Sequence, residues 1–136
     1  MRTRSMVVVV IAGLCAGSVP PAAAHGDVRL SICIPYHVGG ECARRSEAPP
    51  SYHYGDRVPI KGRARPNHEG AVKIQRRRGA RPWRTVARVL LVDGRYRYVW
   101  QTTRRDADQD TPYRFRAVLP DHDRSRVQRV YVLFGE

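Results

Sequence analysis

No apolar run in this sequence is long enough to span a lipid bilayer. The longest covers residues 6–16, whereas a membrane-spanning helix needs about 20 apolar residues. Arg2 and Arg4 precede the run, and three alanines at residues 22–24 follow it. A charged start, a short apolar core and a small-residue cleavage site are typical of a secretory signal peptide. We expect residues 1–24 to be removed, and a secreted, extracellular protein, with the cell wall as one place of action and no membrane span.

Cysteine is also scarce, with three residues in the whole chain. Cys15 lies in the signal segment, so Cys33 and Cys42 remain. They form no Cys-x-x-Cys motif, and no histidine stands at a zinc-ligand spacing from them. In an oxidising compartment an even pair predicts one disulfide, and the glycines at residues 39 and 40 let the chain turn back between them. On the chain-entropy model this bond stabilises the fold by roughly 2 to 3 kcal/mol.

Acidic residues are few compared with basic ones. The chain has 12 Asp and Glu against 25 Lys and Arg, and its formal net charge of +13 falls to +11 without Arg2 and Arg4. A protein this basic is attracted to polyanions such as nucleic acid, teichoic acid or acidic polysaccharide, and salt weakens the attraction. Lysine is nearly absent, since Lys61 and Lys73 are the two in the chain. The excess of arginine has a second explanation, a GC-rich genome that favours arginine codons.

Residue arrangements typical of catalysis are missing. None of the four serines of the expected mature chain lies in a Gly-x-Ser-x-Gly elbow. Nearly every acid stands in an expected turn, so no carboxylate pair is held on rigid strands as glycoside hydrolysis requires. Asp106, Asp108 and Asp110 alternate like the start of a calcium loop, but the glycine and closing glutamate of an EF-hand are absent. We interpret this segment as a solvated loop, and expect no enzyme activity and no cofactor.

Helical periodicity is missing as well, and apolar residues alternate with polar ones instead. Turn signals such as Asp93-Gly94 and Pro120-Asp121 interrupt the alternation at short intervals. The pattern predicts an all-β sandwich of about seven strands. The expected strands are residues 28–34, 58–64, 72–75, 83–92, 96–100, 113–117 and 127–134.

Several short motifs resemble one known family. In chain order they are Tyr54-Gly55-Asp56-Arg57-Val58 with Gly62, Val72-Lys73-Ile74-Gln75-Arg76, Trp83-Arg84-Thr85-Val86-Ala87, Asp93-Gly94-Arg95-Tyr96 and Thr111-Pro112-Tyr113-Arg114-Phe115-Arg116. Over residues 52–134 the chain resembles the secreted immunoglobulin-like, or fibronectin type III-like, β-sandwich domains of actinobacteria. The resemblance implies an Ig-like antiparallel sandwich used for adhesion, spacing or cell-surface binding rather than for catalysis.

A linker at residues 43–51 divides the expected mature chain. Residues 43–51 carry no apolar periodicity and two prolines. We expect a signal peptide at residues 1–24, an N-terminal strand, disulfide loop and linker at 25–51, and one Ig-like domain at 52–136. In such a domain Tyr113 is expected to be a tyrosine corner, with its hydroxyl bonded to the backbone of the preceding loop. Trp83 and Trp100 are expected in the core.

Arginines alternate along several expected strands, which places them on the face opposite the core. In an Ig-like topology the strands of Lys73, Arg77, Arg114 and Arg116 share a sheet, so these residues are expected to form one basic face. Such a face would hold the phosphates or carboxylates of a polyanion without reading sequence. The alternative is a solvated surface rich in arginine through codon usage. Few aromatics stand among these charges, which disfavours stacking of single-stranded nucleic acid.

A metal site is the alternative function. Cleavage after residue 24 makes His25 the N-terminus, and an α-amine beside an imidazole resembles the copper-binding histidine brace of lytic polysaccharide oxygenases and periplasmic copper carriers. Otherwise His25 belongs to a soluble, cleavable junction. A brace needs a second histidine, and the candidates are His37, His53, His68 and His122.

Three functions therefore stand as hypotheses. The first is a secreted, non-enzymatic module that binds an anionic cell-wall polymer or another polyanion. The second is an exported copper-binding protein. The third is a module with a protein partner that pairs with a border strand of a sheet.

Overall fold

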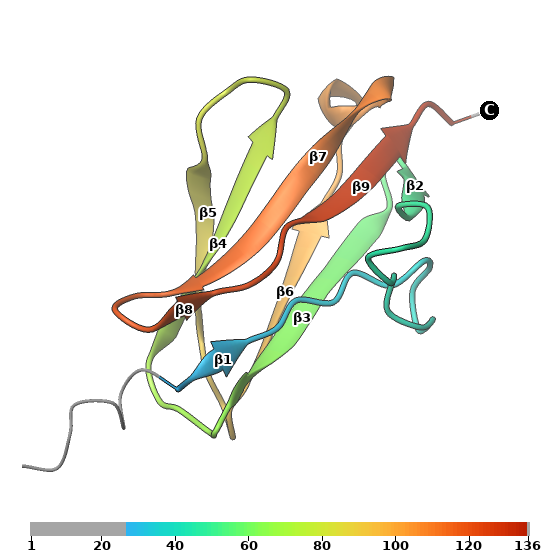
Figure 1. Cartoon of the computed structure of the whole chain (residues 1–136). Helices are drawn as coiled ribbons and strands as arrows, with labels where there is room; N and C mark the ends of the chain where they lie inside the picture. Colours follow the sequence, from blue (N-terminus) through green and yellow to red (C-terminus); the bar gives the residue numbers. More distant parts are fainter. Residues whose placement is uncertain (1–26, 136) are drawn as a thin grey trace, which may run out of the picture.

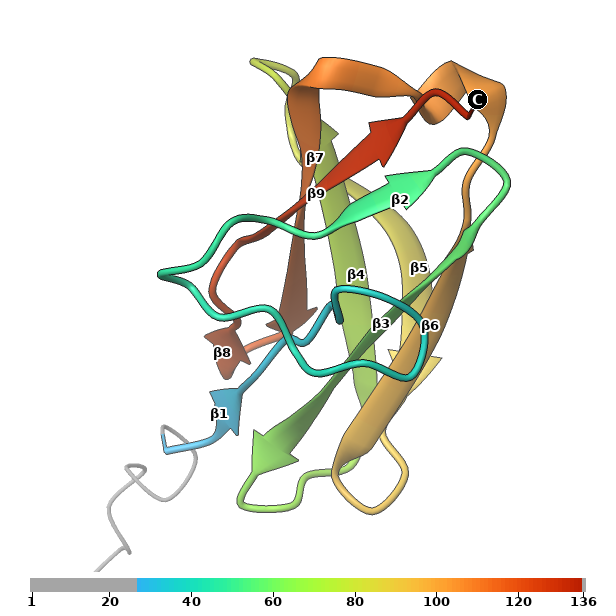
Figure 2. The same cartoon turned by 90° about the vertical axis from the view of Figure 1, so that its right-hand side faces the viewer.

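Two β-sheets with one shared core make up the computed structural model, which describes residues 27–135 (Figure 1; Figure 2). The three-stranded sheet has the order β1-β3-β6. The six-stranded sheet has the order β2-β9-β7-β4-β5, with β8 paired to β7. No helix in this part of the chain is long and apolar enough to cross a membrane. The expected all-β class is confirmed.

The elements are short and follow one another closely along the chain. Their bounds are β1 Arg29–Leu30, β2 Ser51–His53, β3 Arg57–Arg65, β4 Ala71–Arg78, β5 Arg84–Leu90, β6 Arg95–Gln101, the 3-10 turn η2 Arg104–Asp106, β7 Asp108–Leu119, β8 Asp123–Arg124 and β9 Gln128–Leu133.

Seven of the nine strands formed by residues 27–135 overlap the seven expected segments, and β2 and β8 are additional. These two have three and two residues, too few to show an alternating pattern in the sequence. In addition, β2 pairs with β9 in parallel, so the larger sheet is mixed rather than purely antiparallel. The expected count of about seven antiparallel strands is therefore not confirmed.

Alternation explains how the sheets bury their facing sides. Phe115 and Ala117 on β7 are fully buried, whereas Arg114 and Arg116, which alternate with them, are half-buried. Trp100 on β6 is 4% exposed and meets Tyr113 edge-on, with ring centroids 4.9 Å apart. Aromatic pairs prefer this edge-to-face geometry. The expectation that Trp100 lies in the core is confirmed.

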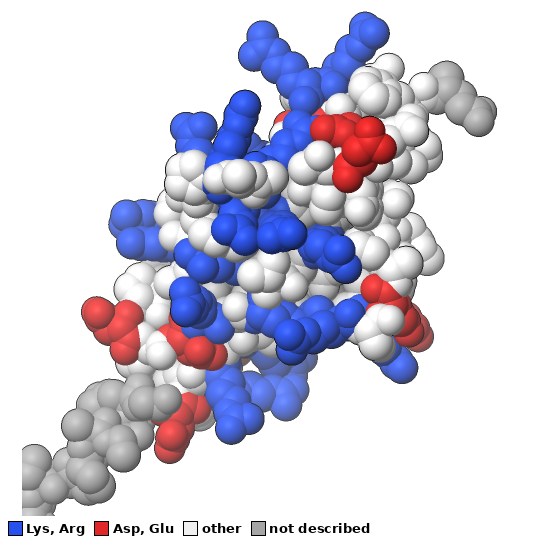
Figure 3. Space-filling view, turned by 45° about the horizontal axis from the view of Figure 1, so that its top comes forward, with Lys and Arg blue, Asp and Glu red and all other residues white. Residues whose placement is uncertain are grey.

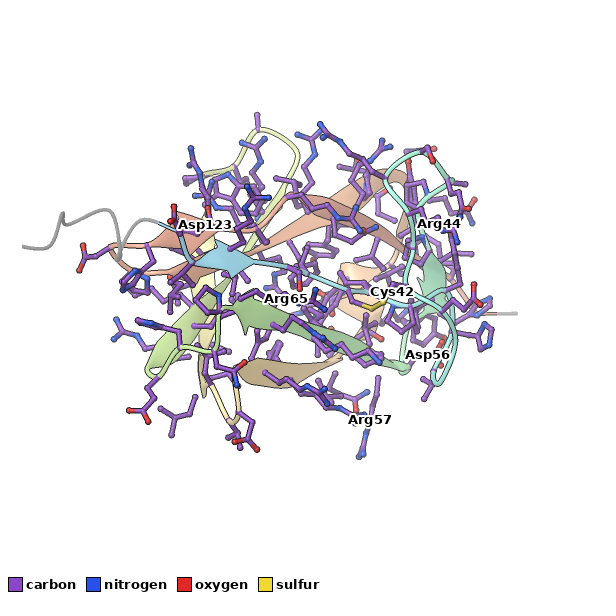
Figure 4. The ribbon with its side chains drawn as sticks, turned by 60° about the horizontal axis from the view of Figure 1, so that its bottom comes forward. Cys42, Arg44, Asp56, Arg57, Arg65 and Asp123 are labelled. Atoms are coloured by element: carbon purple, nitrogen blue, oxygen red, sulfur yellow. A yellow bond between two sulfur atoms is a disulfide. The ribbon has the colours of Figure 1, made fainter. Side chains whose placement is uncertain are left out.

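The segment before β2 packs into the same core. Cys33 exchanges two backbone hydrogen bonds with Lys61 of β3, at 2.6 and 3.0 Å, and it forms the expected disulfide with Cys42, with Cα atoms 5.2 Å apart (Figure 4). The Tyr52 hydroxyl of β2 donates to the Pro35 carbonyl at 2.6 Å. Every second residue from 28 to 34 is apolar and buried: Val28, Leu30, Ile32 and Ile34.

Glycine at position 62 permits the close approach of this segment to β3. A Cβ there would collide with the Ser31 carbonyl oxygen and with the Tyr96 hydroxyl. In that space the Tyr96 hydroxyl donates to the Ser31 carbonyl at 2.6 Å. Burial raises the pKa of Tyr96 above its usual value, so its hydroxyl stays protonated and keeps donating.

The turn predicted at Asp93-Gly94 joins the two sheets. Both residues have positive φ, 52° and 73°, and Val92 pairs with Arg95 across them. Two consecutive left-handed residues define a type I′ turn, for which Asp-Gly is a preferred sequence. The chain thereby passes from β5 of the larger sheet to β6 of the smaller one.

Candidate polyanion interface

Positive charge in this protein is hardly neutralised from within. All of the 25 Lys and Arg except Arg2 and Arg4 lie in residues 27–135, and in that region one ion pair forms, between Arg78 and Asp108 at 3.2 Å. Two backbone amides also donate to Asp108, and together with Arg78 they hold the pKa of this carboxyl below its usual value. The other Lys and Arg of residues 27–135 have no carboxylate of this region within ion-pair distance.

The four residues of the expected basic face lie together on the outer side of the six-stranded sheet. Lys73 and Arg77 come from β4, and Arg114 and Arg116 come from the neighbouring strand β7. Lys73 alternates with the fully buried Val72 and Ile74 on β4, and Arg116 with the fully buried Phe115 and Ala117 on β7. Figure 3 shows this side of the molecule, where Lys and Arg cover most of the middle and Asp and Glu lie toward the margins.

Strand register brings like charges directly opposite one another on this face. Arg77 stands opposite Arg114, and Arg114 stands opposite Arg129 of β9. The three form a row across three adjacent strands. Like charges in directly opposed positions destabilise a sheet, so this row favours the binding of an anion that would relieve the repulsion. The sequence pattern offered a signal for Arg129, because it alternates with the buried Val130.

Arg116 is held in place within this face. Its Nε donates to the Gln75 Oε1 at 2.8 Å. Partial burial, followed by the nearby charges of Arg124 and Arg77, lowers the pKa of Arg116 from its usual value. The guanidinium remains charged at neutral pH, and the direction of the shift reflects a cationic surrounding.

Trp83 is not a core residue, and the expectation for it is wrong. It lies just before β5, is half-buried, and has two guanidiniums over its ring. The Arg77 and Arg116 Cζ atoms lie 4.9 and 4.2 Å from the ring centroid. Cation–π contacts of this kind stabilise a planar guanidinium over an indole. Trp83 therefore orders two of the cations of the basic face.

A pocket of about 360 Å³ opens at the end of this face. One wall is the loop between the disulfide and β2, and the other is formed by β4, β7 and the start of β9. The Arg126 Nη2 donates to the Ala43 carbonyl at 2.8 Å, which ties the loop to the sheet. Six arginines and one acid, Glu47, line this arginine pocket. The arginines are Arg44 (labelled in Figure 4), Arg45, Arg77, Arg114, Arg126 and Arg129.

Two polar atoms of the arginine pocket have no partner. The Arg77 Nε and the Gln128 Oε1 are buried, and in the described part of the chain neither makes a hydrogen bond. Gln128 as a whole is 5% exposed. A buried polar atom without a partner costs free energy. Both atoms are closed off from solvent, so the guanidiniums that line the pocket, and not these two atoms, are what it presents to an anion.

The pocket residues Arg44, Arg45 and Arg126 were missed by sequence reasoning. Arg44 and Arg45 lie in a segment without periodicity, and their approach to the sheet depends on the contact between Arg126 and Ala43, residues 83 positions apart. No local pattern contains such a contact.

Asp106, in the turn before β7, serves a structural role, whereas Asp108 and Asp110 lie within β7 rather than in a solvated loop. Asp106 accepts from the Thr103 amide at 2.7 Å and from the Tyr113 hydroxyl at 2.9 Å. The Tyr113 hydroxyl thus donates to a side chain of the preceding loop, and the expectation that it bonds to the loop backbone is wrong. In residues 27–135 no group of three His, Cys, Asp or Glu could hold a metal ion. His25, the predicted copper ligand, lies outside the described residues.

Comparison with known proteins gives no relative from which a function could be transferred. No protein-family model matches the chain, and a search of curated proteins finds no match.

Proposed function

We propose that this protein is an exported, non-enzymatic Ig-like module that associates with anionic polymers of the cell envelope or the extracellular medium through its basic face and arginine pocket. The observation that carries the proposal is the row of Arg77, Arg114 and Arg129 without an intervening acid. A polyanion neutralises such a row and supplies the oxygen acceptors that its guanidiniums lack.

Export and the Ig-like assignment belong to the same proposal. The disulfide suits an oxidising compartment outside the cytoplasm. The seven expected strand segments fall on observed strands, and the two sheets enclose one core. The signal-peptide pattern of residues 1–24 and the resemblance to secreted Ig-like domains support the same conclusion.

The arginine pocket narrows the chemistry of the polymer. Guanidiniums bind phosphate and carboxylate in two-point contacts, and six of them gather around the arginine pocket. A polyol phosphate presents a phosphodiester in every repeat, so successive repeats can pair with the pocket and with the basic face. Wall teichoic acid has this chemistry and is the polymer with which we would test the proposal.

The test measures binding of purified wall teichoic acid to the mature protein by calorimetry at several salt concentrations. We expect affinity to fall with salt, because bound cations release counterions. Replacing both Arg114→Gln and Arg116→Gln should weaken binding. It should also reduce the slope of log K against log salt concentration by about 1.4, at roughly 0.7 for each lost phosphate contact, the value for single-stranded nucleic acid.

A matched control removes the same charge from the other sheet. Arg29 and Arg65 lie opposite each other on β1 and β3, so Arg29→Gln with Arg65→Gln lowers net charge equally without touching the basic face. This variant should bind nearly as well as the natural protein. Equal losses in the two variants would show that net charge, and not the basic face, holds the polymer.

One observation favours the copper hypothesis as a second candidate. His68 and His122 lie together, with ring centroids 4.2 Å apart. Asp123, the neighbour of His122, accepts from the Leu30 amide at 2.9 Å, so the pair lies at the end of the molecule where the described chain begins (Figure 1). Two imidazoles, the kind of ligand that copper prefers, therefore lie at the same end of the molecule as residue 27, where the described chain begins.

Copper binding to the mature protein tests this candidate. An α-amine ligand requires a free N-terminus, so one extra residue ahead of His25 should weaken copper binding strongly. Replacing His122→Ala should also weaken it, and His53→Ala should leave it unchanged. Copper affinity that is indifferent to the extra residue would remove this candidate and leave the polyanion proposal untouched.

A further inference from the structure

A second concavity crosses the outer face of the three-stranded sheet, on the other sheet from the basic face. It has a volume of about 750 Å³ and runs from the Cys33–Cys42 disulfide over β3 and β6 to the turn that follows β5. Small-molecule sites commonly have volumes of about 300 to 1,000 Å³. Figure 4 shows the surroundings, with Cys42 beside β3 and Arg65 and Arg57 at the two ends of that strand. We call this feature the amphipathic groove.

Four cations line the groove and stand in two opposed pairs. Lys61 is opposite Arg97, and Arg63 is opposite Arg95. The strands β1, β3 and β6 contain no acidic residue. Like charges in directly opposed positions repel each other, so this part of the sheet gains from an anion placed between them.

Apolar side chains line the other part of the groove. Leu90 and Val92 are 71% and 68% exposed, and Val89 lies beside them. The disulfide adds an apolar surface at the far end. Single exposed apolar residues are ordinary on protein surfaces. Here they gather in one concavity together with four cations, and it is this combination that points to a ligand.

The two linings together select one ligand chemistry. A polyanion without apolar groups would leave Leu90 and Val92 in water, and a neutral apolar molecule would leave the four cations unpaired. An amphipathic anion matches both, with its head group between Lys61, Arg63, Arg95 and Arg97 and its tail against Leu90 and Val92. The groove is concave, which suits a single molecule rather than the flat surface of a bilayer.

We propose that the amphipathic groove binds a monomeric amphipathic anion, a single alkyl or acyl chain with a phosphate or carboxylate head group. The inference does not depend on the proposed function, because the basic face belongs to the other sheet. Arg114→Gln with Arg116→Gln, which impairs the basic face, should leave binding in the groove unchanged, so the two proposals can fail separately.

Decyl phosphate, kept below its micelle concentration, is the probe, and inorganic phosphate is its matched control. Each methylene that leaves water strengthens binding about fourfold, so burial of a few gives about a hundredfold tighter binding than phosphate alone. Leu90→Gln with Val92→Thr should remove about tenfold of this advantage without changing the affinity for phosphate. Lys61→Gln with Arg97→Gln should weaken binding of both compounds.

Thermal unfolding of each variant shows whether its fold is retained; Leu90 and Val92 are exposed, so their loss leaves the core intact. A photoreactive alkyl phosphate gives a second measurement on the natural protein, and should label the turn between β5 and β6. The proposal is overturned if decyl phosphate binds no more tightly than phosphate, or if the photoreactive probe labels residues outside the groove. It is also overturned if the protein binds phosphatidylglycerol vesicles but not monomeric decyl phosphate.

Discussion

Trp83 shows how one side chain can organise the charges around it. With Arg77 and Arg116 over its ring at 4.9 and 4.2 Å, it fixes two flexible guanidiniums that would otherwise lose conformational entropy on binding. Trp83→Ala should therefore weaken wall teichoic acid binding by about fivefold to 150-fold, since ordering the two freed arginine side chains on binding costs about 0.5 to 1.5 kcal/mol each. Calorimetry measures this effect. Trp83→Phe, which keeps an aromatic face, should recover part of the affinity, and equal affinity of the alanine variant would contradict the ordering role.

Tyr52 ties the disulfide segment to β2 through its bond to the Pro35 carbonyl. Burial raises the pKa of Tyr52 to about 12. The folded-state pKa is above the unfolded value of about 10, so the stabilisation is complete below pH 10 and is lost as pH rises toward 12. Tyr52→Phe should lower the free energy of unfolding by about 1 kcal/mol at neutral pH and flatten its decline above pH 10. Urea unfolding across this pH range measures both effects. If the variant loses stability above pH 10 as steeply as the natural protein does, the ionisation of Tyr52 is not the cause of that loss.

At the scale of the strand, repulsion between the cations of β3 and β6 lowers the stability of the fold, and a substitution can relieve it. Lys61 stands opposite Arg97, and an opposite-charge pair contributes roughly 0.2 to 1 kcal/mol where a like-charge pair destabilises. Lys61→Glu should therefore raise the free energy of unfolding by about that amount, and Lys61→Gln by less. Chemical unfolding at low and high salt measures it, since salt should shrink the gain. A destabilised glutamate variant would show that the cations do not repel across the strands.

Alternation at the strand scale also explains how much of the fold the sequence predicts. The long strands carry apolar residues at every second position, so β3, β4, β6, β7 and β9 could be placed, and with them Arg77 and Arg114 on one outer face. Two short strands and the mixed pairing with β9 have no such signal. Trp83 is expected in the core because an indole can bury a large area. Its ring stacks at the surface instead, on arginines of β4 and β7, two strands whose contact with it no local spacing predicts.

The same reasoning separates the predictable half of the candidate site from the rest. The basic face follows from period-two spacing along single strands. The arginine pocket depends on a loop that folds back onto β9 through Arg126 and Ala43, and the amphipathic groove depends on which sheet receives β6. Both are consequences of tertiary contacts between distant residues, to which no local spacing corresponds.

For the whole molecule, the disulfide closes a short loop in a segment that already packs into the core. Replacing Cys33→Ser and Cys42→Ser should lower the free energy of unfolding by about 2 to 3 kcal/mol, mainly by freeing the unfolded chain. The backbone bonds between Cys33 and Lys61 remain, so the variant should still fold. Urea unfolding of the oxidised, reduced and substituted proteins measures the effect. A reduced protein as stable as the oxidised one would mean that core packing alone holds the segment.

The order of the strands also bears on self-association of the protein in solution. β5 ends the larger sheet and β6 ends the smaller one, and exposed arginines, among them Arg84, Arg88 and Arg97, occupy these open edges. Such edges are sites of self-association unless charge keeps copies apart. At about 1 M salt the screening length is about 3 Å, so that protection vanishes. Light scattering should therefore detect larger particles at the salt concentrations that release the polyanion. If particle size does not change, something other than charge repulsion keeps the copies apart.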